Sequence, residues 1–150
     1  MTNVDLLQNN MLFRGSSTEE IEFILGLFQE RQLKPNTTIF TENMPAEALY
    51  IVKSGSVRIT VMVGEGEELG LLLLGPGEFF GELALVQEGN RLVTARSETP
   101  VELLLLTRND FQAMLSLEPR AAARALMIIT KLLAMRVKTY SEKFKEYLVS

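Results

Sequence analysis

The stretch Gly75–Leu85, which reads GPGEFFGELAL, is followed by Arg91, nine residues after Glu82. Glycines let a backbone approach a ligand closely, and a short helical turn after Gly81 would aim its N–H groups at an anion. The guanidinium of Arg91 would add a fork of donors that suits two phosphate oxygens. This combination predicts a small-anion site and suits a cyclic phosphodiester.

The same stretch resembles the phosphate-binding cassette of the cyclic nucleotide-binding domain family, whose pattern is roughly F-G-E-[LI]-A-L, a spacer, then R-[AST]-A-T. Residues 80–85 read FGELAL without departure, and residues 91–94 read RLVT. Residues 39–43 (IFTEN) and 49–57 (LYIVKSGSV) also resemble the family. The chain is thus similar to the sensor domains of cAMP receptor proteins and protein kinase A regulatory subunits.

The resemblance implies a mainly β fold with flanking helices, namely an eight-stranded antiparallel β-roll (jelly roll) with N-terminal helices and a long C-terminal helix. We expect one domain over residues 1–150, because a chain of this length can bury a core without disulfides or metals. Its parts would be N-terminal helices in 1–30, the β-roll in 31–107 with the cassette at 80–94, and C-terminal helices in 108–150.

The residue pattern between positions 31 and 107 is typical of antiparallel strands, because short apolar runs alternate with turn residues. The continuous apolar run Leu103–Leu106 predicts a strand that is covered on both faces. Asn43 stands where the family usually has glycine, and asparagine tolerates a positive φ better than most residues. The predicted strands cover residues 38–40, 49–53, 57–63, 69–74, 93–97 and 101–107.

Helix signals flank these strands. Ser16–Glu20 (SSTEE) predicts the start of an amphipathic helix that runs to about Glu30. Asn109 opens a short helix through Leu115, and Pro119 then opens a long helix that continues to about Tyr147. This long helix carries an apolar stripe, interrupted by Arg136, that consists of Leu126, Ile129, Leu133 and Tyr140. The stripe fits either packing of the helix on its own roll or a homodimer interface.

The resemblance implies specific roles for the cassette residues. Arg91 would bind the phosphate, and Glu82 would accept a hydrogen bond from the ribose 2′-hydroxyl. Glu82 could also stabilise the short helix through its dipole and pair with a nearby arginine. Gly81, Leu83 and Ala84 would contribute backbone N–H groups, whereas Phe80 and Leu85 would anchor the loop by packing.

Leu92 and Val93 depart from the family pattern, which has a small or hydroxyl residue and then alanine after the arginine. Two larger apolar side chains could narrow the pocket, and Leu92 cannot supply the hydroxyl that often assists guanine recognition in the family. Cyclic AMP is therefore the expected ligand, with cyclic GMP less favoured. The alternative is a domain that has lost its ligand and serves as a protein-interaction scaffold.

The composition excludes several kinds of chemistry. The chain has no cysteine and no histidine, so it lacks a thiolate or imidazole nucleophile and the usual zinc or iron ligands. This argues against the metal-dependent cupin enzymes, which share a β-roll but rely on histidine. We therefore expect a non-enzymatic binding module without a cofactor or metal.

Charge and terminal segments bear on partners and location. Residues 1–117 hold 8 Lys/Arg against 16 Asp/Glu, and residues 118–150 hold 7 against 3. The basic tail could complement a helix dipole or contact an acidic partner or membrane surface. With no signal peptide and no apolar run long enough to span a bilayer, we expect a cytoplasmic protein. With no helix-turn-helix after the last helix, we expect an unknown protein effector rather than DNA.

Overall fold

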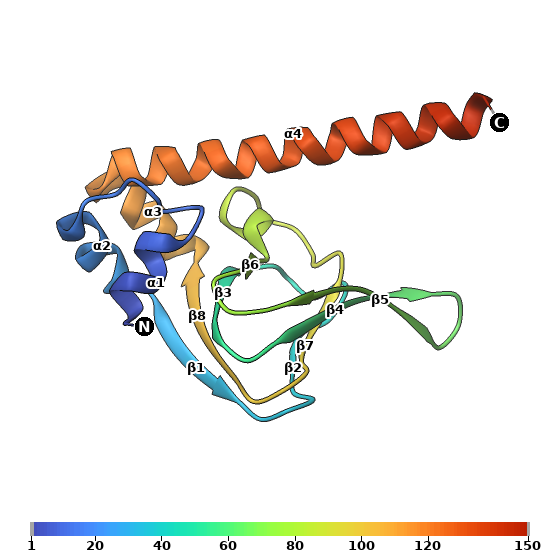
Figure 1. The fold of residues 1–150 in the computed structure, drawn as a ribbon, viewed down its shortest axis with the longest axis horizontal. Coiled ribbons are helices and arrows are strands. Elements are labelled where there is room, and N and C mark those ends of the chain that lie inside the picture. The colour runs from blue at the N-terminus through green and yellow to red at the C-terminus, as the bar shows by residue number, and fades with distance from the viewer. Residues whose placement is uncertain (1, 150) are drawn as a thin grey trace.

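The computed structural model describes the backbone of residues 2–149. The side chains of residues 140, 144 and 147–149 lie outside the described part, and with them the predicted place of Tyr140 in the apolar stripe. Two short helices precede a roll of strands, and two helices follow it (Figure 1). The helices are α1 (Asn3–Asn9), α2 (Thr18–Leu25), the 3₁₀ helix η1 (Glu82–Leu85), α3 (Arg108–Leu117) and α4 (Pro119–Val149). The strands are β1 (Gln29–Leu33), β2 (Thr38–Phe40), β3 (Ala48–Ser54), β4 (Val57–Val63), β5 (Glu67–Leu74), β6 (Phe79–Phe80), β7 (Thr94–Ser97) and β8 (Val101–Thr107).

The roll consists of two four-stranded antiparallel sheets, ordered β1-β8-β3-β6 and β2-β7-β4-β5. This confirms the predicted eight-stranded antiparallel β-roll with flanking helices. Strand β6 pairs with β3 so that Phe80 lies opposite Tyr50. Because Gly81 follows Phe80 directly, this register places the start of the cassette beside β3.

Strand β8 separates two hydrophobic cores, because its leucines alternate between its faces. Leu104 and Leu106 pack among the helices, while Leu103 and Leu105 face the interior of the roll. All four are at most 2% exposed. The prediction that the run Leu103–Leu106 is covered on both faces is confirmed.

The structure corrects the prediction that the helix after Ser16–Glu20 runs to about Glu30. Ser17 caps α2 in a capping box with Glu20, as that pattern predicts, but α2 already ends at Leu25. Residues 29–33 instead form β1, which pairs with β8. The sequence QERQL of β1 is polar and half-exposed to exposed, so it lacks the alternation that would reveal a strand.

Asn43 adopts a φ of 69°. The prediction that asparagine replaces glycine in a turn with positive φ is therefore confirmed. Its N–H donates to the carbonyl of Arg91 at 2.8 Å. The turn after β2 is thus tied directly to the loop that carries the predicted phosphate ligand.

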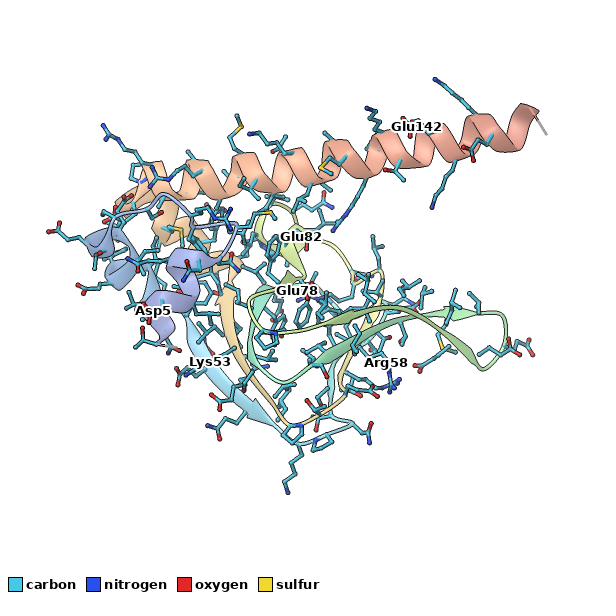
Figure 2. The ribbon with its side chains drawn as sticks, viewed as in Figure 1. Asp5, Lys53, Arg58, Glu78, Glu82 and Glu142 are labelled. Carbon is cyan, nitrogen blue, oxygen red and sulfur yellow. The ribbon has the colours of Figure 1, made fainter. Side chains whose placement is uncertain are left out.

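Helix α4 passes over α3 and η1 and extends beyond the roll (Figure 1). Its distal half is exposed, as the position of Glu142 in Figure 2 illustrates. In contrast, Ile129 of the predicted apolar stripe is buried in the helix-side core, and Leu126 and Leu133 pack against that core. Among residues 2–149, every helix is too short or too polar to cross a membrane.

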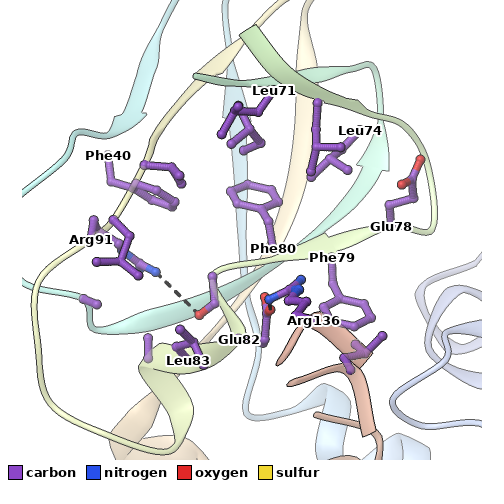
Figure 3. A pocket seen from close by; sticks show the side chains of 18 of the residues that line it. Phe40, Leu71, Leu74, Glu78, Phe79, Phe80, Glu82, Leu83, Arg91 and Arg136 are labelled. Carbon is purple, nitrogen blue, oxygen red and sulfur yellow. Dashed lines mark hydrogen bonds and ion pairs between the residues drawn. The ribbon is translucent and has the colours of Figure 1, made fainter. Parts of the chain in front are cut away.

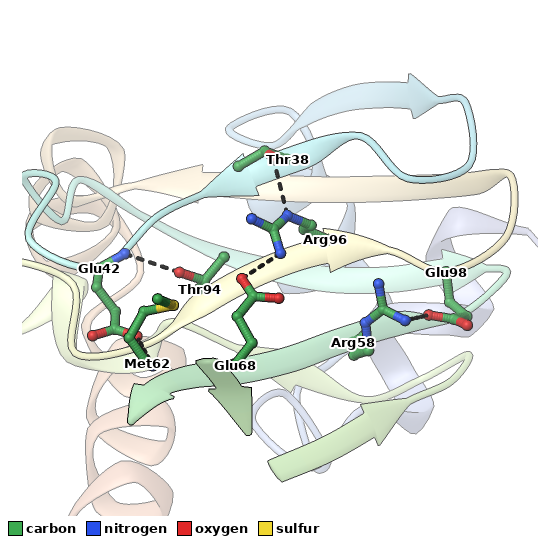
Figure 4. A network of polar contacts seen from close by, with 8 residues as sticks. All are labelled: Thr38, Glu42, Arg58, Met62, Glu68, Thr94, Arg96 and Glu98. Atoms are coloured by element: carbon green, nitrogen blue, oxygen red, sulfur yellow. Dashed lines mark hydrogen bonds and ion pairs between the residues drawn. The ribbon is translucent and has the colours of Figure 1, made fainter. Parts of the chain in front are cut away.

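Polar contacts hold the β4–β5 hairpin against the neighbouring strands (Figure 4). The carboxylate of Glu42 accepts a hydrogen bond from the N–H of Met62 at 2.6 Å. An ion pair joins Glu68 of β5 to Arg96 of β7. These contacts fix the position of β5, whose far end lines the cavity described below.

We predict that Leu104→Ala destabilises the fold by about 2–5 kcal/mol, because it leaves a cavity between β8 and the helices. Leu73→Ala is the matched control, since Leu73 is 62% exposed and Leu104 is fully buried. Exposed substitutions usually change stability by less than about 0.5 kcal/mol. Urea unfolding measures both, and equal effects would contradict the assignment of β8 to the core.

Candidate ligand-binding site

A cavity of about 600 Å³ opens between η1, β5 and α4 (Figure 3). This volume lies within the range of about 300–1,000 Å³ that is usual for small-molecule sites. Its lining brings together all seven residues that the sequence predicts as ligand contacts, namely Gly81, Glu82, Leu83, Ala84, Arg91, Leu92 and Val93. Among the described residues, no three metal-ligating side chains form a cluster that could hold a metal ion.

Gly81 has a left-handed backbone, with a φ of 77°, and caps η1. A Cβ at this position would lie 2.7 Å from Nη1 of Arg91 and 3.1 Å from the carbonyl oxygen of Ala48. Glycine is therefore required both for the turn and for the close approach of the guanidinium. The predicted short helical turn after Gly81 is confirmed as η1.

The N–H of Ala84 donates to the carbonyl of Gly81 at 3.2 Å. The resemblance to the family cassette implies that this N–H contacts the ligand. In the structure it is engaged within η1, so a ligand would have to share it or displace the Gly81 carbonyl. Phe80 and Leu85 are buried, as predicted for residues that anchor the cassette by packing.

Arg91 lies in the wall of the cavity and is only 7% exposed. Its Nη2 donates to the carbonyl of Ala48 at 2.7 Å, and its Nη1 lies 3.5 Å from the carbonyl oxygen of Gly81. The guanidinium carbon sits 4.0 Å from the ring centroid of Phe40, which is a cation–π contact. Among the described residues, Nε has no hydrogen-bond acceptor.

Burial lowers the pKa of the Arg91 guanidinium, and electrostatic interactions with Tyr50, Glu47 and Glu82 raise it. An arginine nevertheless stays protonated in proteins at neutral pH. The cavity therefore contains a desolvated cation whose hydrogen bonds go mainly to neutral carbonyl groups. Such a cation would interact strongly with an anion that entered the cavity.

Glu82 is buried, and its Oε1 lies 2.7 Å from Nη1 of Arg136 in α4 (Figure 3). The predicted pairing of Glu82 with a nearby arginine is therefore observed. A carboxylate offers about four acceptor positions, so this ion pair leaves Glu82 capacity for a ribose hydroxyl. Arg136 connects the cassette to the last helix.

Leu92 is 72% exposed and lies at the rim of the cavity, whereas Val93 is partly buried against the interior of the roll. One of the two departures from the family pattern therefore lies at the rim of the cavity, and the other lies against its interior wall. The lining also includes residues that the sequence did not predict as ligand contacts, among them Phe40, Leu71, Leu72, Leu132 and Arg136. Of these five, only Arg136 stood out in the sequence, because it interrupts the apolar stripe of the last helix.

Comparison with known proteins agrees with this architecture. The family model described as cyclic nucleotide-binding domain matches residues 30–118. The chain belongs to the cyclic nucleotide-binding domain family. Among curated proteins, the cyclic AMP receptor protein of Thermus thermophilus is 36% identical over 125 residues, which are 83% of this chain and 58% of the relative. The chain thus spans less than two thirds of that relative.

Two solved structures illustrate the breadth of the cyclic nucleotide-binding domain family. The N-terminal domain of a transcriptional regulator from Streptomyces coelicolor superposes with a TM-score of 0.80 at 32% identity, covering 88% of this chain and 94% of that one. The regulatory domain of Toxoplasma gondii PKA, a co-crystal structure with cAMP, gives a TM-score of 0.68 at 31% identity and covers 74% and 42% of the two chains. Both likenesses extend over most of this chain.

Proposed function

We propose that this domain binds a cyclic nucleotide, cyclic AMP in preference to cyclic GMP, and that occupancy changes the position of α4. The observation that carries the proposal is the buried guanidinium of Arg91 in a cavity of about 600 Å³ beside the start of η1. A cyclic phosphodiester presents two anionic oxygens, which match the donors of a guanidinium. The Toxoplasma relative, whose structure contains cAMP, supports this choice of ligand.

Binding would exchange partners at Arg91. In the structure its donors face the carbonyls of Ala48 and Gly81. A guanidinium is attracted more strongly to an anionic oxygen than to a neutral carbonyl, because the two opposite charges add a Coulomb attraction. A phosphate is therefore expected to replace at least one carbonyl, while the ring of Phe40 keeps the guanidinium plane in place.

The remaining walls suit the sugar and the base. Glu82 would accept a hydrogen bond from the ribose 2′-hydroxyl while it still pairs with Arg136. Leu71 and Leu72 of β5 and Leu132 of α4 would pack against the faces of the base. Leu92 supplies no hydroxyl for guanine, so guanine gains no additional hydrogen bond at this position and adenine is favoured.

A non-enzymatic role fits this site. The buried polar side chains of the cavity are Glu82 and Arg91, each already held by an arginine or by carbonyls. General acid–base catalysis would need a group poised to exchange a proton with the substrate. We therefore propose a regulatory module that requires no cofactor.

A second candidate is a ligand-free interaction domain. It is favoured by the hydrogen bond of Arg91 to Ala48 and by the large side chain of Leu92 at the rim. For either candidate function, we expect a partner molecule to bind α4. We propose a protein effector or a second copy of the chain, because exposed apolar side chains lie along α4; these are Met127, Met135 and Val137.

We predict saturable binding of cyclic AMP in the micromolar range and weaker binding of cyclic GMP. Isothermal titration calorimetry on nucleotide-free protein measures both affinities, and mass spectrometry of the purified protein detects any nucleotide carried along. If neither ligand saturates the protein at millimolar concentration, the ligand-free candidate replaces the first one.

We predict that Arg91→Ala weakens cyclic AMP binding about ten- to a hundred-fold, because a hydrogen bond to a charged group contributes roughly 1.5–3 kcal/mol. Glu82→Ala should instead reduce the preference for cyclic AMP over its 2′-deoxy analogue. Arg58→Ala is the control, since Arg58 of β4 pairs with Glu98 and does not line the cavity. A Glu82 variant that kept the full ribose preference would disprove the proposed role of Glu82.

We predict that nucleotide changes amide exchange in residues 121–140 of α4, because Leu132 and Arg136 both line the cavity. Arg136→Gln removes the ion pair with Glu82 and should reduce this response more than it reduces affinity. Hydrogen exchange mass spectrometry with and without cyclic AMP measures the response. Identical protection of this span in both states would contradict transmission through α4.

A further inference from the structure

Arg108 makes an unusual set of hydrogen bonds at the junction of β8 and α3. Its Nη1 donates to the carbonyls of Ala46 at 3.0 Å, Ala84 at 3.1 Å and Gln87 at 3.2 Å. Its backbone N–H also donates to the carbonyl of Glu47 at 2.8 Å. One residue thus contacts the loop before β3 and both the end of η1 and the loop after it.

The acceptors explain why a cation lies there. The last carbonyls of a helix have no partner within the helix and form the negative end of its dipole. In η1 this end includes Ala84, and the chain continues through Gln87 toward the loop that carries Arg91. A single Nη1 has two hydrogens for three carbonyls, so at least one hydrogen is shared.

We propose that Arg108 is a positioning residue for the cassette. It holds the carbonyl end of η1 against the loop before β3, and so fixes the direction in which the opposite, amide end of η1 faces the cavity. Arg108 does not line the cavity and does not act on a ligand directly. Its effect on nucleotide affinity rests on the proposed function, whereas its hold on η1 is a property of the ligand-free protein.

Arg108 is also the first residue of α3, and Thr107 caps that helix by accepting from the N–H of Asp110 at 3.1 Å. Any displacement of η1 along its axis must therefore move α3, stretch the bonds of Arg108 or break them. This gives the cassette a polar connection to the C-terminal helices that is separate from the Glu82–Arg136 ion pair.

The shape of the side chain matters in addition to its charge. A guanidinium reaches one bond further than a lysine ammonium and holds its donors in a fixed plane. Lysine at position 108 would keep the positive charge but is expected to reach fewer of the carbonyls. A series from arginine through lysine to glutamine should therefore weaken the hold on η1 stepwise.

The test is amide exchange of the ligand-free protein, followed by NMR or mass spectrometry. Val86 and Gln87 both donate to the carbonyl of Leu83 at 3.2 Å and report on the end of η1. In Arg108→Gln we expect exchange at residues 84–87 to be about tenfold faster or more, because local opening becomes easier. Arg108→Lys should be intermediate, and amides in β3 and β8 should be unchanged.

Cyclic AMP affinity is measured on the same variants and should fall about tenfold in Arg108→Gln, mainly through faster dissociation. Arg58→Gln removes the ion pair between Arg58 of β4 and Glu98, and it should change neither the exchange at residues 84–87 nor the affinity for cyclic AMP. Unchanged exchange at 84–87 would overturn the proposal, and so would equal acceleration throughout β3 and β8, because that would indicate general destabilisation. If Arg108→Gln fails to fold, the same exchange and affinity measurements on Arg108→Lys are compared with those on the parent protein.

If the parent protein binds no nucleotide, the proposed function fails while the exchange experiment still decides the role of Arg108. Conversely, normal exchange in a variant of a protein that binds cyclic AMP overturns the role of Arg108 and leaves the function intact.

Discussion

Burial of the Arg91 guanidinium removes a permanent charge from water, and the structure around the cavity compensates for that desolvation. An unpaired buried charge is strongly unfavourable. Here the carbonyl of Ala48 accepts one hydrogen bond and the face of Phe40 lies against the cation. Gly81 is a consequence of the same constraint, because Nη1 occupies the space that a Cβ would need.

The aromatic side chains that support Arg91 also belong to the core of the roll. Phe40, Tyr50 and Phe80 pack on one another with ring centroids 5.2–5.9 Å apart. Closely packed interiors resist small displacements, so the guanidinium is held by groups that cannot move without disturbing the core. The cation is therefore held by the rigid part of the fold, while the proposed response to a ligand would lie in α4.

The sequence predicted the features that are local. The run FGELAL specifies a tight turn and a short helix, and the leucines at 103–106 specify a strand between two cores. It did not predict β1, because QERQL is an edge strand whose residues remain largely exposed. It could not predict that Arg91 donates to Ala48 or that Arg136 meets Glu82, because these contacts join residues 43 and 54 positions apart. An isolated arginine such as Arg108 looks like any surface arginine until its acceptors are known.

The short helix η1 is held at both ends by arginines from successive helices. Arg136 of α4 pairs with Glu82 at its start, and Arg108 of α3 binds carbonyls at its end. The two contacts differ in the number of their hydrogen bonds, because Arg136, whose side chain is 52% exposed, binds one oxygen of Glu82, whereas Arg108 donates to three carbonyls. The contact to α4 should therefore shift more readily than the contact to α3 when a ligand enters the cavity, while Arg108 keeps η1 in register. If the proposed function holds, this difference would let α4 move while η1 stays in place.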